Sequence, residues 1–392
     1  MKSPFLFSKY KSKIEPNIFW ALSATFLYSL GFASVIFLPA YLHIELQHTI
    51  MSTGVAMSVY GVGSVIASYY GGKLCDSFSA KNISIISLIF SIVSLSFIYL
   101  IKQPYWLIMI FLVFLGMSNS AFLPASRIYL MRFSAPDALA SINGIRYTLY
   151  NTGCAVSLSL ASWITGTHFK RIFLIGILIN FFSLLTFVFG CNKEKIIHLK
   201  NNLIKSKLLN DKFLLGIMLC FFFGMLVFSQ FNSIFSLFLF TNYHISAHQL
   251  GTLFTINCLM IVLLQIKLLG FFKSISQPFL MVMGSFVLGI GFFILLFSHH
   301  FWLAILSTVI ITLGEMMFMP VSQNVVFQNA KEGTQGYHMG IYQTLCSIAL
   351  IVSPFLGSLA LKINPQGVLL WSISLGLCTL PLAIYFYLRK VS

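Results

Sequence analysis

The sequence predicts an all-α integral membrane protein in which twelve transmembrane helices form two six-helix repeats. Three observations predict this class. Of the 392 residues, 58% are hydrophobic and only 8% are charged, whereas a soluble domain carries about 25% charged residues. Long apolar runs alternate with short polar gaps, and the basic residues collect in every second gap. Landmarks in the first half of the chain also recur in the second half.

Twelve apolar runs are long enough to cross a bilayer, which takes about 20 residues of helix. The predicted helices cover residues 17–39, 50–72, 82–101, 105–130, 141–166, 171–190, 213–240, 248–270, 277–298, 301–327, 337–362 and 367–388. A polar, lysine-rich stretch follows the sixth of them. We therefore expect an N-terminal six-helix half at 1–191, a basic cytoplasmic linker at 192–212, and a C-terminal six-helix half at 213–392.

The basic residues predict the orientation. If the N-terminus is cytoplasmic, 20 of the 24 Lys and Arg residues fall on that side, and the other side holds Lys102, Lys170, Arg171 and Lys362. Cytoplasmic loops of membrane proteins carry such an excess. The distribution predicts a multi-pass protein of a cell membrane, such as a bacterial inner membrane, with both termini cytoplasmic. Basic residues placed in gaps between apolar runs argue against nucleic-acid binding.

Enzyme chemistry finds little support in the sequence. The seven cysteines are scattered, and no Cys/His cluster has the spacing of metal ligands. We see no nucleophile motif and no phosphate-binding loop. The sequence therefore predicts a protein that is not an enzyme and that has no metal and no cofactor.

An internal repeat relates the two halves. Three landmarks of the predicted fourth and fifth helices recur, each 196 residues later, in the tenth and eleventh: Pro124 as Pro320, Gly144 as Gly340, and Thr148 as Thr344. Two six-helix halves repeated in parallel are one of the known architectures of membrane transporters.

A short motif follows the predicted second helix, where Gly72, Leu74, Asp76 and Lys81 stand. These residues match the signature G-x-L-a-D-[RK]-x-G-[RK]-[RK] of the major facilitator superfamily, from which Ser77 and Ser79 depart. The chain thus resembles that superfamily along its whole length. The resemblance implies the major facilitator fold, secondary active transport by alternating access, and a monomer.

The same motif predicts a conformational switch loop made of Gly72, Asp76, Lys81 and Arg127. Gly72 would permit a tight turn. The Asp76 carboxylate would face the positive end of a helix and a guanidinium such as that of Arg127, stabilising one arrangement of the two halves. The alternative is that Asp76 and Lys81 are solvated loop charges.

Helix 10 carries Gly314, Glu315 and Pro320, and Gly336 and Gly340 follow before helix 11. This stretch of sequence resembles the bacterial drug/proton antiporter branch of the superfamily. The resemblance implies proton-coupled efflux of amphipathic compounds. The antiporter pattern in helix 5 lacks its proline, so two alternatives stay open. One is proton-coupled uptake of a small nutrient or metabolite, including an anionic one; the other is a transporter-like receptor that does not transport.

Glu315 is the one acid of the eight that falls inside a predicted span, roughly 20 Å from the start of its helix. A carboxylate at that depth must face a cavity, find a partner or carry a proton. We therefore expect Glu315 to be the proton-coupling residue. The alternative is a protonated structural glutamate that donates a hydrogen bond to a helix carbonyl.

The substrate, protons and the lipid bilayer are the expected partners. In the superfamily that the chain resembles, helices 1, 2, 4, 5, 7, 8, 10 and 11 line the central cavity. Polar and aromatic residues at mid-depth in these helices form the expected substrate cavity: Tyr28, Asn119, Arg146, Tyr147, Tyr150, Asn151, Gln230, Asn232, Asn257 and Gln343. Arg146 either extends to the cytoplasmic surface or reaches the cavity, where it would bind an anion.

Overall fold

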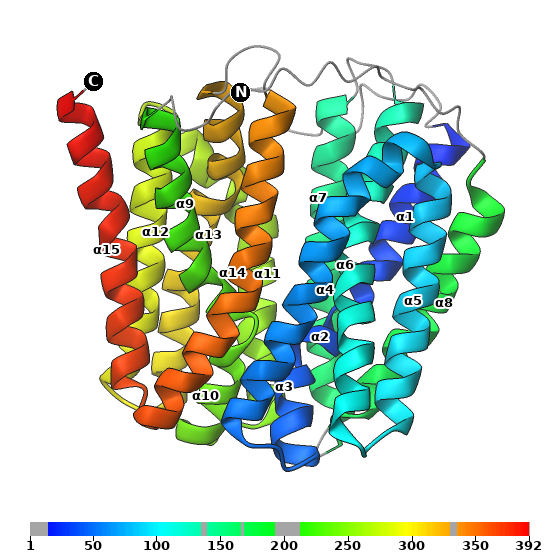
Figure 1. The fold of residues 1–392 in the computed structure, drawn as a ribbon, viewed down its shortest axis with the longest axis horizontal. Coiled ribbons are helices and arrows are strands. Elements are labelled where there is room, and N and C mark those ends of the chain that lie inside the picture. Colours follow the sequence, from blue (N-terminus) through cyan, green and yellow to red (C-terminus); the bar gives the residue numbers. More distant parts are fainter. Residues whose placement is uncertain (1–14, 135–138, 166–167, 193–211, 330–334, 392) are drawn as a thin grey trace.

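The computed structural model describes residues 15–134, 139–165, 168–192, 212–329 and 335–391, and within these ranges the regular structure is helical (Figure 1). The expected linker at 192–212 lies almost wholly outside the described residues. The division of the chain into two halves at that linker stays a prediction.

The first six spans begin with an interrupted helix, made of α1 (Pro16–Leu30), α2 (Ala33–Ile36), α3 (Leu38–Ala40) and the π-helix η1 (Tyr41–Glu45). They continue with α4 (Ile50–Ser77), α5 (Ala80–Leu100), α6 (Tyr105–Phe133), α7 (Leu139–Thr165), and α8 (Arg171–Leu185) with η2 (Thr186–Gly190). Small residues and Pro39 at the interruptions explain why the first span bends, since they weaken the helical hydrogen-bond ladder.

The second six spans begin with α9 (Lys212–Phe231) and α10 (Ile234–Asn242), followed by α11 (Ala247–Phe271) and α12 (Gln277–Phe293) with η4 (Ile294–Leu296). They end with α13 (Phe301–Asn329), α14 (Gln335–Ile363) and α15 (Val368–Val391). The predicted single helix at 213–240 is broken at Asn232 and Ser233, where Ser233 has φ −133° and ψ −74°.

Eleven of the described helices are long and apolar enough to cross a membrane. The remaining predicted span corresponds to α7, which has 27 residues. It is long enough but carries Asn143, Arg146 and Asn151 towards its N-terminal end. Such polarity is tolerated where a helix faces protein or a water-filled cavity instead of lipid, so α7 is a candidate to line a functional site.

The expected tight turn at Gly72 is wrong, because α4 continues as a helix to Ser77. The chain turns at Phe78 and Ser79, where the Ser79 hydroxyl accepts a hydrogen bond from the Asn82 backbone N–H at 3.1 Å and caps α5. The chain therefore turns at the Ser79 hydroxyl cap and not at Gly72, where the motif predicted the turn.

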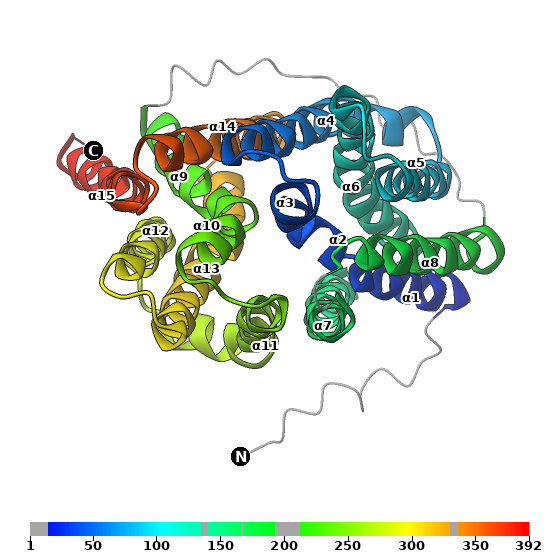
Figure 2. The same ribbon diagram turned by 90° about the horizontal axis from the view of Figure 1, so that it is seen from below.

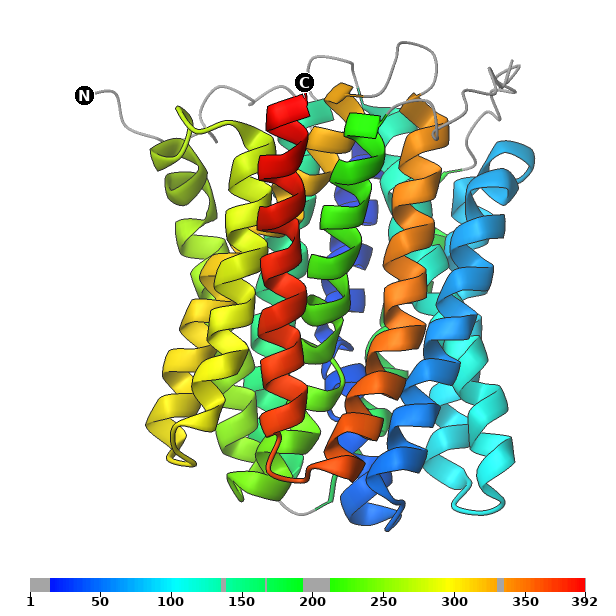
Figure 3. The same cartoon turned by 60° about the vertical axis from the view of Figure 1, so that its left-hand side comes forward.

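The helices form two groups, with α1 and α4–α8 on one side and α9 and α11–α15 on the other (Figure 1). Across the boundary α4 packs against α14 and α7 packs against α11; Figure 3 shows α14 beside α4. We call the end at which α1 begins and α15 ends the near end, which is the predicted cytoplasmic side, and the opposite end the far end.

The two groups are in contact at the far end. There α3 packs against α10, and the ring of Phe169, which is 4% exposed, meets Phe240 edge-on at 5.7 Å. The view along the bundle shows α3 and α10 near its centre (Figure 2). Aromatic contacts of this kind add about 0.5–1.5 kcal/mol beyond the area that they bury, so they hold the far end closed in this conformation.

Towards the near end, the two repeat-related helices α7 and α14 present matching exposed faces. Thr148 Oγ1 donates to the Gly144 carbonyl at 3.0 Å, and Thr344 Oγ1 donates to the Gly340 carbonyl at 2.9 Å. A β-carbon added at either glycine would meet no atom within 4 Å. These faces of α7 and α14 are therefore unpacked towards the near end, whereas α3 and α10 are in contact at the far end.

Close packing of α4 on α6 depends on Gly116, because a β-carbon there would collide with the Tyr60 carbonyl group. We expect Gly116→Leu to lower the melting temperature of the detergent-solubilised protein by at least about 5 °C, since overpacking against backbone costs about 1–3 kcal/mol or more. Gly376→Leu on α15 is the matched control, because a β-carbon at Gly376 meets nothing within 4 Å. Equal melting temperatures for the two variants would contradict this account.

Candidate functional site

Glu315 lies midway along α13, and its carboxyl group is built into a polar cluster. Asn257 on α11 donates from Nδ2 to Glu315 Oε2 at 2.7 Å and to Thr312 Oγ1 at 3.0 Å. The Thr312 hydroxyl in turn donates to the Thr308 carbonyl at 2.6 Å. Thr312 and Glu315 are three residues apart and so share one helix face. The cluster fixes the carboxyl group in one place.

The same two helices are joined again by a residue about two turns further along α11. Gln265 on α11 donates from Nε2 to the Met316 carbonyl of α13 at 2.9 Å, and its side chain is buried. The α11–α13 pair is therefore held on both sides of the carboxyl group.

A second polar chain joins three helices of the first group. Tyr28 on α1 donates its hydroxyl to Asn119 Oδ1 on α6 at 2.6 Å, and Asn119 Nδ2 donates to the Tyr60 hydroxyl on α4 at 2.9 Å. The Tyr28 ring packs on Phe122 with centroids 4.1 Å apart. A cavity of about 20 Å³ adjoins Tyr28, Asn119 and Asn180, which is enough for about one water molecule.

The polar residues of α7 border the Glu315 cluster. Tyr147 is 42% exposed, and its helix α7 packs against α11, the helix that carries Asn257 of the other group. Asn151 is buried and donates from Nδ2 to the Tyr147 carbonyl at 2.9 Å. The ring of Tyr150 meets Phe32 of α1 edge-on at 6.4 Å. The acid and the aromatic residues thus belong to one region between the two groups.

Three more of the expected cavity residues lie in the C-terminal half of the chain. Gln230 is buried and donates from Nε2 to the Ser353 carbonyl of α14 at 3.0 Å, so its amide joins α9 to α14. Asn232 is half-buried in the break between α9 and α10. Gln343 is exposed on α14 towards the near end. A contact of these residues with substrate stays a prediction.

Of the predicted switch residues, Lys81 makes the clearest contacts. Its ammonium group donates to the Val188 carbonyl at 3.0 Å and to the Cys191 carbonyl, both at the end of η2. A cation at a helix C-terminus is stabilised by the helix dipole. Arg127 is exposed on α6. The side chain of Asp76 lies outside the described residues, so its expected partner stays a prediction.

Two residues of these networks were missed by sequence reasoning. Tyr60 completes the chain through Asn119, and Thr312 shares the Asn257 amide with Glu315. Thr312 could have been found from its spacing of three residues before the acid. Tyr60 carried a weaker signal, namely a hydroxyl in a helix that was already expected to line the cavity.

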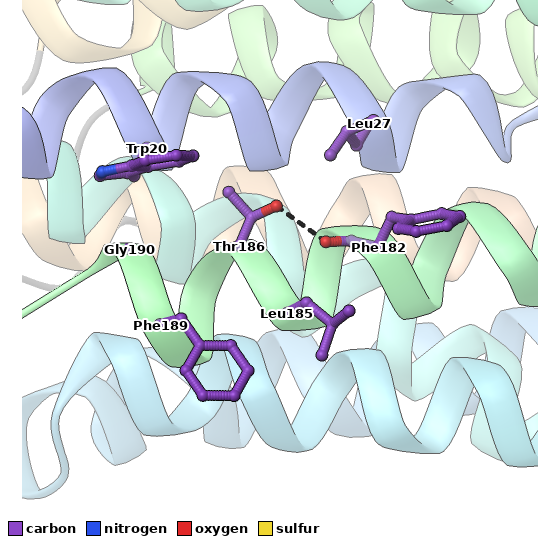
Figure 4. A pocket seen from close by; sticks show the side chains of 7 residues that line it. All are labelled: Trp20, Leu27, Phe182, Leu185, Thr186, Phe189 and Gly190. Atoms are coloured by element: carbon purple, nitrogen blue, oxygen red, sulfur yellow. Dashed lines mark hydrogen bonds between the residues drawn. The ribbon is translucent and has the colours of Figure 1, made fainter.

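A groove of about 430 Å³ lies between α1 and the α8–η2 span. Figure 4 shows its lining, whose polar side-chain groups are the Trp20 indole nitrogen and the Thr186 hydroxyl, which donates to the Phe182 carbonyl at 2.7 Å. Phe182 and Phe189 are 55% and 82% exposed. In a bilayer such a surface faces lipid chains, and its lining holds no ionisable group. The groove is therefore not the candidate site.

Comparison with known proteins gives one consistent picture. The family model described as Major Facilitator Superfamily matches residues 21–241 and 217–392. The MFS-type transporters YqjV and YttB of Bacillus subtilis (strain 168), both described as uncharacterized, are 22% and 23% identical over 89% and 81% of this chain, and over 87% and 81% of their own lengths.

Solved structures show the same fold. The nucleoside transporter NupG superposes with a TM-score of 0.80 at 16% identity, covering 94% of this chain and 99% of that one. The POT family transporter PepTSo superposes with a TM-score of 0.80 at 12% identity, covering 96% of this chain and 98% of that one. At this level of sequence identity, the structural similarity shows the fold alone.

Proposed function

This chain belongs to the major facilitator superfamily of membrane transporters, and we propose that it is a proton-coupled secondary active transporter that exports small amphipathic molecules. The observation that carries the proposal is Glu315. Among the acids whose side chains are described, it alone lies in the middle of a membrane-crossing helix. An ionisable group at that depth is costly and is characteristic of proton and substrate pathways.

The surroundings of Glu315 suit a group that gains and loses a proton. Hydrogen bonding from Asn257 stabilises the ionised carboxylate, whereas the apolar interior of the bundle stabilises the neutral acid. Because these two effects oppose each other, Glu315 can exist in both the protonated and the ionised form. A conformational change that exposes the cluster to water first on one side of the membrane and then on the other would let Glu315 bind a proton on one side and release it on the other.

The amphipathic substrate class is supported by the aromatic side chains beside the acid. Tyr147 is exposed, and Tyr150 packs with Phe32 one turn further in. Export is supported by the resemblance of the motif formed by Gly314, Glu315 and Pro320 to the sequences of drug/proton antiporters. Uptake with a co-transported proton is the alternative, and both directions need the same acid. In the orientation that the basic residues favour, both termini and the near end face the cytoplasm.

The test is proton movement in proteoliposomes that enclose a pH-sensitive dye, with empty liposomes as the control. A panel of amphipathic compounds is added outside. Antiport exchanges entering substrate for leaving protons and makes the interior alkaline, whereas symport makes it acidic. Entry of a substrate without any pH change would contradict proton coupling, and no entry of any compound would contradict transport.

A further inference from the structure

Two arginines stand together near the near end, and none of the acids whose side chains are described pairs with them. Arg127 on α6 is exposed, Arg146 on α7 is half-buried, and the charge of Arg127 acts repulsively on Arg146. Within the described ranges neither guanidinium makes a hydrogen bond or an ion pair, and the Nε atom of Arg146 is buried with no acceptor. A half-buried cation beside a second cation is unfavourable, so an anion bound next to Arg146 would lower that electrostatic cost.

Arg146 lies inside its span with part of its guanidinium group shielded from water. It stands seven residues into α7, roughly 10 Å below the helix end. An arginine that extends to the membrane surface keeps its charged head wet, whereas the Nε atom of this half-buried arginine is buried without an acceptor. Arg127 lies at a similar depth, roughly 9 Å from the end of α6, and is exposed. A cation that is partly buried at this depth therefore has an exposed cation at its own level.

The described acids do not neutralise this pair. Glu315 accepts a hydrogen bond from Asn257 and makes no ion pair with Arg127 or Arg146. Glu45 accepts from the Lys170 backbone N–H at 3.1 Å, in the loop region of the far end. Glu15 is exposed before α1.

The wall beside the arginines is aromatic. Tyr150 lies one turn further into α7 than Arg146 and interacts with it electrostatically, and its ring meets Phe32. Tyr28, whose ring packs on Phe122, follows on α1. A molecule bound here would place a negative group at the arginines and an apolar body against these rings. Planar carboxylates suit guanidinium groups because two parallel hydrogen bonds can form.

We infer that Arg146, assisted by Arg127, binds the carboxylate of the transported molecule, which makes the substrate an amphipathic organic anion. This inference rests on the proposed transport function and narrows its substrate class. The anionic headgroup of a phospholipid presents related chemistry, and the experiment below separates the two sources.

The experiment measures binding and requires neither transport nor protons. Purified protein in phosphatidylcholine nanodiscs is heated with a panel of monocarboxylates, from acetate to naphthoate, and with the neutral amide of each. At least one aromatic acid is expected to raise the melting temperature while its amide does not. Arg146→Gln is expected to lower the affinity for that acid at least about tenfold, as loss of a hydrogen bond to a charged group does. Arg127→Gln should lower the affinity less, and Arg146→Lys should bind the acid more tightly than Arg146→Gln does.

Arg389→Gln, at the exposed end of α15, is the matched control and should bind as the wild type does. Binding is measured without a proton gradient, so failure of proton coupling and failure of anion recognition would be seen separately. The inference is overturned if amides stabilise as well as acids, or if no acid binds. It is also overturned if phosphatidylglycerol nanodiscs, but no soluble acid, give an Arg146-dependent stabilisation. The comparison of acid with amide needs no substitution, so it decides even if Arg146→Gln does not fold.

Discussion

Replacing Glu315 with glutamine is expected to abolish substrate-driven proton movement while leaving substrate exchange intact. Glutamine keeps the size of the side chain, and its carbonyl oxygen can still accept from Asn257 Nδ2, the donor that lies 2.7 Å from Glu315 Oε2. The cluster with Thr312 therefore survives, but the group that binds the proton is gone. We expect proton flux to fall by at least about 100-fold, because the removal of an essential acid–base group has an effect of this size.

Two measurements in proteoliposomes check this result. Internal pH reports net proton-coupled flux, and exchange of labelled for unlabelled substrate reports cycles that need no net proton transfer. Glu45→Gln makes the same chemical change outside the central cluster, where the carboxylate accepts from the Lys170 N–H, and should leave both activities near wild type. Proton coupling that survives in Glu315→Gln would make Glu315 a structural residue and would remove the basis of the proposed mechanism.

The fold could be predicted in outline because the bilayer imposes one simple requirement, a long apolar helix for each crossing. The boundaries of α11 and α12, for example, follow from flanking polar residues. The end of α4 was mispredicted because Gly72 suggested a turn, whereas in a helix that packs closely against its neighbours glycine is also a contact residue. The break at Ser233 had no signal, since no proline or charge marks it.

The central acid could be predicted as well, because a single glutamate in an apolar span is conspicuous. Its partners could not, since Asn257 lies 58 positions earlier in the chain and only the packing of α11 on α13 brings the two together. Sequence also gave no way to tell a cavity amide from a helix-joining one. Gln230 and Asn257 are both amides inside predicted spans, but the first donates to a backbone carbonyl and the second donates to the acid.

The contact between α4 and α14 is the place where the two groups of helices meet most closely. A β-carbon on Gly61 would lie 2.6 Å from the Leu350 carbonyl oxygen and 2.9 Å from the Ile351 nitrogen. Leu350 is four residues before Pro354, which has no N–H to donate to that carbonyl. The helix therefore offers an unpaired carbonyl at the point where glycine lets the two backbones approach.

Gly61→Leu is expected to reduce transport more than tenfold by destabilising this conformation. The backbone of α14 cannot yield as a flexible side chain would, so the overpacking cost of about 1–3 kcal/mol weighs against the closed far end. The opposite conformation, in which the far end opens, does not need this contact to the same degree. The equilibrium between the two should therefore shift, by about tenfold for each 1.4 kcal/mol.

Thiol labelling at the far end measures that shift directly. In a background with the native cysteines replaced by serine, a cysteine at Phe169 loses the contact with Phe240 and is shielded only while the far end is closed. We expect it to react faster in Gly61→Leu than with Gly61 intact. Gly270→Leu, where a β-carbon meets nothing within 4 Å, should change neither labelling nor transport. Unchanged labelling together with normal transport in Gly61→Leu would mean that the α4–α14 contact does not control opening of the far end.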